Sequence, residues 1–227
     1  MLNTKAFKAY DLRGIYPEEV NEELAYRVGK VFCALFGAEA VVVGRDIRLT
    51  GPRLVEALSN GLRDGGANVI DIGCCGTEMV YFATAYLNAD GGIMITASHN
   101  PAIYNGIKVF TYGGRDADEI QTKDIEKWLL EAEKLYTPCH EEDGQMPPPS
   151  YTELVKQGIV EEINPMNEYL DNILSVINVD AIRKRDLRVA VDPMYGVSLT
   201  ALSTILAVAR CTVETINAQH DLSLIHI

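Results

Sequence analysis

Several kinds of segment are missing or scarce in this chain of 227 residues. No apolar run approaches the roughly 20 residues of a membrane-spanning helix, and the opening MLNTKAFKAYDLRG lacks the apolar stretch of a signal peptide. Cysteine occurs five times, an odd number, and no two cysteines have CxxC spacing. These absences argue against a membrane protein, a disulfide framework and a zinc site. We therefore expect a cytoplasmic protein.

Basic residues are also scarce relative to acidic ones. The chain has 20 lysines and arginines against 32 aspartates and glutamates, which gives a net charge of −12. Such a chain repels polyanions, so neither nucleic acid nor an anionic membrane is an expected partner. A small anionic ligand remains compatible with this charge, because a few basic groups in one cleft outweigh distant, screened carboxylates.

Residues 1–136 alternate between helical and strand patterns. Apolar residues recur at helical spacing from Val20 to Leu35, with Asn21 as the expected N-cap and Gly37 as the expected stop. Strands that alternate with helices indicate an α/β layer fold with a sheet buried on both faces. Further helices are predicted at 54–62, 79–87 and 125–135, and strands at 40–43, 69–72, 92–96 and 107–111.

Residues 137–150, TPCHEEDGQMPPPS, are predicted to be a linker, because three consecutive prolines favour an extended, semi-rigid segment. Asn164-Pro165 then predicts a helix start. Later patterns indicate a strand at 187–191, a helix at 197–209 and a strand at 211–216. We expect residues 151–227 to be an incomplete second α/β domain of similar type, since about 77 residues are too few to close one.

The end of the chain has an unusual composition. Codons that can encode LSLIHI resemble a transposon end sequence used in preparing sequencing libraries. We therefore expect residues 222–227 to be a non-native tail, and the natural protein to continue beyond Asp221. A short terminal strand is the alternative.

The strongest functional pattern is TASHNP at residues 96–101, followed by YNGIK at 104–108. The preceding GGIMI places Ser98 at the end of a strand, where open α/β sheets bind ligands. Adjacent side chains point in different directions, so Ser98 and His99 are a poor nucleophile–base couple of the triad type. On its residues alone, an ordinary polar loop remains an alternative interpretation of this segment. A nucleotide-binding Rossmann domain is disfavoured, because no GxGxxG follows the first strand.

Several ordered motifs resemble the α-D-phosphohexomutase family. TASHNP with YNGIK is similar to its phosphoserine loop, YDLRG at 10–14 to its YDxRG motif, GRD at 44–46 to its first-domain turn, and VDPMYG at 191–196 to the start of its second domain. GTEMVYFA at 76–83 is most similar to the phosphomannomutase/phosphoglucomutase branch. The resemblance implies a three-layer α/β/α domain with a mixed sheet over residues 1–136, followed by the incomplete second domain.

The resemblance also implies a chemistry. Ser98 would carry a phosphoryl group and pass it to a hexose phosphate, so that a hexose 1,6-bisphosphate forms, turns over and returns its other phosphate. Arg13 and Lys108 would bind the transferring phosphate. His99 would act as general acid and base, a role that Lys108 could share. Tyr10 would line the pocket of the phosphosugar substrate, and Mg²⁺ would bind through the phosphate on Ser98.

Other residues and motifs define what this chain is expected not to do. Arg45, Asp46 and Arg48 are predicted to form a structural ion-pair cluster instead of binding ligand.

The family's DGDxDR-type magnesium loop, its GEMSGH-type sugar loop and its later phosphate clamp do not occur in these residues. We therefore expect this chain to be nearly inactive and its full-length parent to be a mutase for mannose or glucose phosphate. The alternatives are a phosphosugar-binding module or remnant without turnover, a serine-dependent phosphatase, and a phosphoglucosamine mutase.

Overall fold

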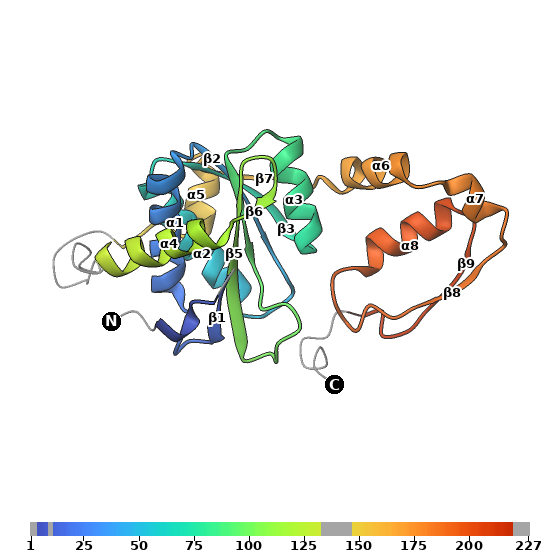
Figure 1. The fold of residues 1–227 in the computed structure, drawn as a ribbon, viewed down its shortest axis with the longest axis horizontal. Helices are drawn as coiled ribbons and strands as arrows, with labels where there is room; N and C mark the ends of the chain where they lie inside the picture. Colours follow the sequence, from blue (N-terminus) through green and yellow to red (C-terminus); the bar gives the residue numbers. More distant parts are fainter. Residues whose placement is uncertain (1–3, 9–10, 133–146, 220–227) are drawn as a thin grey trace.

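The computed structural model describes residues 4–8, 11–132 and 147–219 (Figure 1). Tyr10, the predicted tail at 222–227 and residues 137–146 of the predicted linker lie outside the described residues.

The first long helix begins and ends where the sequence predicts. Helix α1 spans Glu22–Phe36, and the Asn21 side chain accepts a hydrogen bond of 2.9 Å from the Leu24 N–H. Gly37 follows in the left-handed conformation, with φ of 61°. Both caps satisfy main-chain groups that a helix leaves unpaired at its ends.

The remaining elements of the first unit match most of the predicted segments within a few residues. They are a 3-10 turn η1 at Thr4–Ala6, β1 at Leu12–Ile15, β2 at Ala40–Arg45, α2 at Gly51–Asp64, β3 at Asn68–Cys74, α3 at Thr77–Tyr86, β4 at Gly91–Ile95, β5 at Tyr104–Thr111, β6 at Arg115–Asp116 and α4 at Glu119–Ala132.

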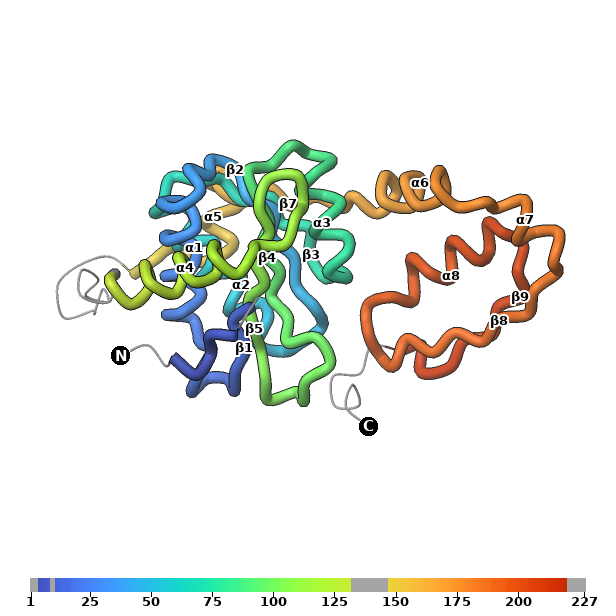
Figure 2. Tube along the Cα trace, in the orientation of Figure 1, coloured from blue at the N-terminus to red at the C-terminus, as the bar shows by residue number. Residues whose placement is uncertain are grey.

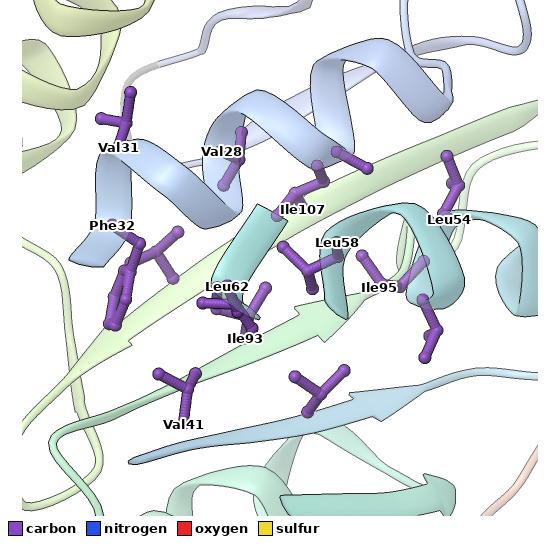
Figure 3. Packing of buried hydrophobic residues seen from close by; sticks show 14 of the residues in the cluster. Val28, Val31, Phe32, Val41, Leu54, Leu58, Leu62, Ile93, Ile95 and Ile107 are labelled. Carbon is purple, nitrogen blue, oxygen red and sulfur yellow. The ribbon is translucent and has the colours of Figure 1, made fainter. Parts of the chain in front are cut away.

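Six strands form a mixed sheet in the order β1-β5-β4-β2-β3-β7, and β6 pairs with β5. Strands β2, β3, β4 and β7 run parallel, whereas β5 is antiparallel to both β4 and β1. One face packs against α1, α2 and α4 through a large apolar cluster that includes Phe32, Leu58 and Ile93 (Figure 3). The other face packs against α3 through Val80, Met94 and their neighbours. The predicted three-layer α/β/α architecture is confirmed.

The first sheet is completed by residues beyond the predicted linker. Helix α5 spans Tyr151–Lys156, and β7, Val160–Glu162, pairs with the edge strand β3. The Tyr151 hydroxyl donates to Asp71 on β3 at 2.6 Å and lies 3.1 Å from Glu162. The sequence placed the start of the second domain at residue 151, but β7 extends the first sheet and Leu154 of α5 packs in the apolar cluster of the first unit. Three residues of strand are too short to show this pairing by periodicity.

The second unit contains one small sheet. It comprises α6 at Met166–Val176, α7 at Val179–Arg183, β8 at Arg188–Val191, α8 at Leu199–Val208 and β9 at Thr212–Thr215. Strands β8 and β9 pair in parallel and α8 connects them, so this is a single β-α-β unit, and α6 lies between it and α3 (Figures 1 and 2). The Phe82 and Tyr169 rings, 5.5 Å apart, join α3 to α6. None of the helices in the described ranges is both long and apolar enough to cross a bilayer.

Candidate phosphoserine site

Ser98 lies in the loop between β4 and β5, just after the carboxyl end of β4. Its side chain is exposed, and its φ of 57° places it in the left-handed region. This conformation costs a residue other than glycine about 1–2 kcal/mol. Strain of this kind persists only where neighbouring contacts hold it.

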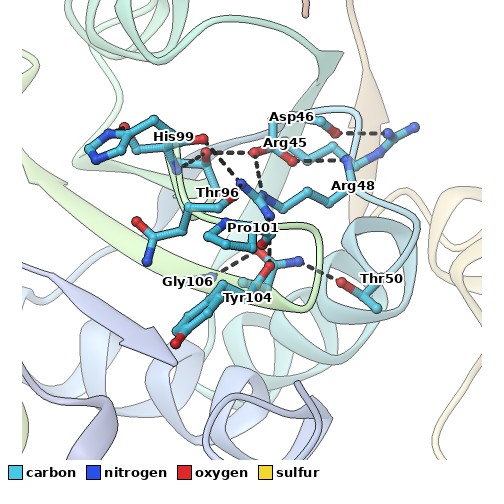
Figure 4. Close-up of polar contacts among 12 residues, drawn as sticks. Arg45, Asp46, Arg48, Thr50, Thr96, His99, Pro101, Tyr104 and Gly106 are labelled. Atoms are coloured by element: carbon cyan, nitrogen blue, oxygen red, sulfur yellow. Dashed lines mark hydrogen bonds and ion pairs between the residues drawn. The ribbon is translucent and has the colours of Figure 1, made fainter. Parts of the chain in front are cut away.

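Arg48 is the principal contact of this loop. The residue is 4% exposed and lies in the polar segment after β2. Its guanidinium donates at 2.7–3.1 Å to four main-chain carbonyls of the loop, those of Ser98, Asn100, Pro101 and Tyr104 (Figure 4). Its Nε donates to the Asp46 carboxylate at 3.1 Å. Every N–H of the guanidinium therefore has an acceptor.

The Asp46 carboxylate connects Arg48 to the other side of Ser98. The Thr96 hydroxyl donates to Asp46 at 2.6 Å and accepts a hydrogen bond of 2.9 Å from the Ser98 N–H. The predicted ion-pair cluster thus exists between Arg48 and Asp46. Arg45 instead donates to the main-chain carbonyl of Asp46, at 3.4 Å. Burial lowers the pKa of Arg48, and the Asp46 carboxylate partly offsets this.

The Asn-Gly pair of YNGIK has a packing role. Asn105 is buried, donates from Nδ2 to the Thr50 hydroxyl at 2.7 Å and accepts from the Gly106 N–H at 2.8 Å. A Cβ on Gly106 would lie 2.5 Å from the Leu12 carbonyl oxygen and 2.7 Å from that of Thr96. Only glycine therefore lets β1 and the start of the Ser98 loop approach β5 this closely.

Arg13 and Lys108 lie on the same face of the sheet. Arg13 on β1 pairs with Gly106 on β5, two residues before Lys108, and alternate residues of a strand share a face. Lys108 pairs with Met94, which belongs to the apolar cluster under α3. Arg13 donates to the Asn100 side chain at 3.2 Å and to Asp11 at 2.5 Å, so it contacts the Ser98 loop directly.

His99 is exposed, and its Nδ1 lies 3.3 Å from the Ser98 hydroxyl oxygen. This distance is at the long end for a hydrogen bond involving a hydroxyl group. The pair is therefore in contact without the short, buried geometry of a triad.

A cavity of about 330 Å³ opens beside Ser98 and His99. Its wall includes Cys75 and Met94 of the first unit. The turn after β8 adds Met194, Gly196 and Val197 of the second unit to the wall. Burial is the main reason that the pKa of the Cys75 thiol is raised to about 12, and Cys74 adds to it.

A larger cavity, of about 1040 Å³, lies between α1, α2 and α5. Its lining has six carboxylate residues and five basic ones, and it includes none of the predicted site residues that the structure describes. Of the predicted site residues that the structure describes, Ser98 and His99 line the smaller cavity, whereas Arg13 and Lys108 line neither of the two.

Comparison with known protein families matches two models to this chain. The alpha/beta/alpha domain I of phosphoglucomutase/phosphomannomutase matches residues 4–135, and its domain II matches residues 167–224. This chain belongs to the phosphoglucomutase/phosphomannomutase family.

Individual members of the family give the same assignment. A phosphomannomutase of Escherichia coli K12 is 40% identical over 180 residues, which are 79% of this chain and 36% of that protein. The phosphohexose mutases of Xanthomonas campestris pv. campestris B100 are 59% identical over 104 residues, 46% of this chain and 23% of that protein. A Burkholderia thailandensis family member of known structure has a TM-score of 0.77 and 28% identity, covering 99% of this chain and 46% of that one. The chain thus spans about a third of the E. coli relative's length.

The residues around Ser98 offer few groups that could bind a metal ion. The described ranges hold no group of three or more His, Cys, Asp or Glu side chains that could bind a metal ion. The carboxylate of Asp46, which lines the cavity beside Ser98, already accepts from Thr96 and Arg48. These residues do not form a magnesium site among themselves.

The sequence motifs therefore mark one place in the structure. The structure places Ser98 and His99 in contact with each other in the loop after β4, brings Arg13 against Asn100 of that loop, and puts Lys108 on the same sheet face as Arg13. The role of Arg48 as the anchor of the loop was missed, because its partners are main-chain carbonyls some 50 residues further along the chain.

Proposed function

We propose that this chain is the phosphoserine-bearing part of a phosphohexomutase that interconverts hexose 1-phosphate and hexose 6-phosphate of mannose, glucose or both. One observation carries the proposal: Ser98 is exposed at a strand end while both its main-chain N–H and its carbonyl are fixed by hydrogen bonds. A fixed and accessible hydroxyl is what phosphoryl transfer requires, because positioning and charge neutralisation supply most of its rate.

In the first half-reaction, a hydroxyl oxygen of the hexose phosphate bonds to the phosphorus on Ser98. The bond between that phosphorus and Ser98 Oγ breaks, and the hydroxyl proton passes to His99 or Lys108. A hexose 1,6-bisphosphate and a free Ser98 result, once Oγ has taken up a proton. The second half-reaction transfers the other phosphate back to Ser98 by the same bonds in reverse and leaves the isomeric hexose phosphate.

Arg13 and Lys108 are proposed to neutralise the transferring phosphate. Arg13 is suited to this role because its guanidinium already contacts Asn100 in the loop, at 3.2 Å, and a planar guanidinium binds phosphate through two hydrogen bonds. Tyr10 is proposed for the sugar pocket on the family resemblance. For the whole protein we also propose that Mg²⁺ binds with the Ser98 phosphate as one of its ligands.

We further propose that these 227 residues catalyse little interconversion by themselves. The cavity beside Ser98 is about 330 Å³ and is walled by only a few residues of the second unit. Orientation of the substrate supplies much of an enzyme's rate, so a partly walled site should bind and turn over poorly.

The test is phosphorylation of the chain by glucose 1,6-bisphosphate and by mannose 1,6-bisphosphate. Intact-protein mass spectrometry and peptide mapping should find one phosphoryl group, on Ser98. The matched control variants are Ser98→Ala, which should remain unmodified, and Ser175→Ala, which should be modified as the wild type is. Excess bisphosphate and long incubation allow for the slow reaction expected of this chain, and under these conditions phosphate on another residue, or none on Ser98, would refute the proposal.

The same phosphorylated chain separates the alternatives. Mixed with mannose 6-phosphate or glucose 6-phosphate, a mutase fragment should lose its phosphate to the sugar and form the 1,6-bisphosphate. Release of inorganic phosphate without bisphosphate would indicate a phosphatase. Retention of the phosphate in the presence of either sugar, with glucosamine 6-phosphate active instead, would indicate a phosphoglucosamine mutase.

A further inference from the structure

The main-chain carbonyl and the main-chain N–H of Ser98 are both connected to the ion pair of Asp46 and Arg48. Its carbonyl accepts from Arg48 Nη2 at 3.1 Å. Its N–H donates to the Thr96 hydroxyl at 2.9 Å, and that hydroxyl donates to Asp46 at 2.6 Å. Asp46 and Arg48 are joined at 3.1 Å, so these contacts close a ring through the main chain of Ser98.

The loop that carries Ser98 has few main-chain hydrogen bonds of its own. Between β4 and β5 the loop has two internal main-chain hydrogen bonds, Asn100 N–H to Ala97 and Tyr104 N–H to Pro101, among the contacts of the described residues. Neither involves Ser98. Ser98 therefore depends on one side chain of its own loop, that of Thr96, and on Arg48 from outside the loop.

We propose that Arg48 is a positioning residue for phosphoryl transfer, which acts with Asp46 and Thr96 to hold Ser98 in its left-handed conformation and to direct its hydroxyl toward the cavity. This inference rests on the proposed function of Ser98. Arg48 itself does not need to touch the substrate, because all five of its N–H groups are already used.

Lysine should be unable to take over the role of Arg48. An ammonium group has three donors and no planar fork, so it cannot serve four carbonyls and a carboxylate together. In Arg48→Lys the rate constant for phosphorylation of Ser98 by glucose 1,6-bisphosphate should fall about a hundredfold, the loss expected from a misplacement of about 1 Å. The matched control is Arg188→Lys, at an exposed ion pair with Glu214, which should keep the wild-type rate.

Thr96 provides a test that does not change any charge. Thr96→Val removes the hydroxyl at constant size and should slow phosphorylation, whereas Thr96→Ser keeps the hydroxyl and should restore most of the rate. A merely structural role would reduce the fraction of folded protein, measured by circular dichroism, without changing the rate constant of the folded molecules. Equal rate constants for folded wild type, Arg48→Lys and Thr96→Val would overturn the inference.

Amide hydrogen exchange tests the ring without phosphorylation. Exchange of the peptide that covers residues 96–104 should be faster in Thr96→Val than in Thr96→Ser, with exchange in α1 unchanged. If exchange is equal in the two variants, the ring does not hold the loop and the inference fails. If exchange differs but the wild type is never phosphorylated, the proposed function fails and Arg48 remains only an anchor of the loop.

Discussion

The strained conformation of Ser98 predicts an unusual order of stability among its variants. Ser98→Gly and Ser98→Ala both remove the hydroxyl and its 3.3 Å contact with His99. They differ in one respect, since glycine adopts a φ of 57° freely and alanine does not. Ser98→Gly should therefore be the more stable of the two, although glycine ordinarily lowers stability.

The size of the difference follows from two opposing terms. The left-handed conformation costs alanine about 1–2 kcal/mol. Glycine gives the unfolded chain extra freedom that costs about 0.4–1 kcal/mol. The free energy of unfolding of Ser98→Gly should thus exceed that of Ser98→Ala by about 1 kcal/mol. At Ala102, an exposed loop residue without positive φ, Ala102→Gly should instead lose about 0.4–1 kcal/mol.

Tryptophan fluorescence provides a suitable assay. Trp128 is the single tryptophan of the chain and lies on α4, in the first unit. Its emission in a urea titration therefore reports unfolding of the unit that contains Ser98. If Ser98→Ala proves as stable as Ser98→Gly, Ser98 is not held in a left-handed conformation in solution, and the positioning argument loses its basis.

Three further predictions concern packing and titration. Gly61→Ala should lower the free energy of unfolding by about 1–3 kcal/mol, because a Cβ there would lie 1.9 Å from the Tyr26 carbonyl oxygen, and urea titration measures this. Tyr151→Phe should cost about 1–3 kcal/mol in the same titration, because it leaves the buried Asp71 carboxylate without its 2.6 Å donor. The raised pKa of Cys75, about 12 against an ordinary 9.0, favours the folded state below pH 9 and ceases to do so as pH rises toward 12. In Cys75→Ala, the decline of thermal stability between those pH values should be shallower than in the wild type.

Each of these variants has its own control or contradicting result. Gly51→Ala places its Cβ 3.3 Å from the flexible Arg45 side chain and should change stability far less than Gly61→Ala. Tyr112→Phe, at a residue 65% exposed, should fall within about 0.5 kcal/mol of wild type. An unchanged alkaline decline in Cys75→Ala would show that other groups cause it.

The sequence by itself determined the alternation of helices and strands in the first unit. Asn21 and Gly37 act through contacts within a few residues, so α1 could be predicted almost to the residue. The motif around Ser98 could also be recognised, because its residues are contiguous and follow a buried strand.

Only the tertiary structure showed which distant residues belong together. The pairing of β7 with β3 and the four carbonyl contacts of Arg48 join segments that are tens of residues apart, and main-chain carbonyls leave no trace in the residue types of a sequence. The left-handed conformation of Ser98 was likewise outside the reach of sequence, since serine is not a residue that favours it. Local patterns fix the elements, and the enclosing contacts fix the conformation of the residue proposed to carry the phosphate.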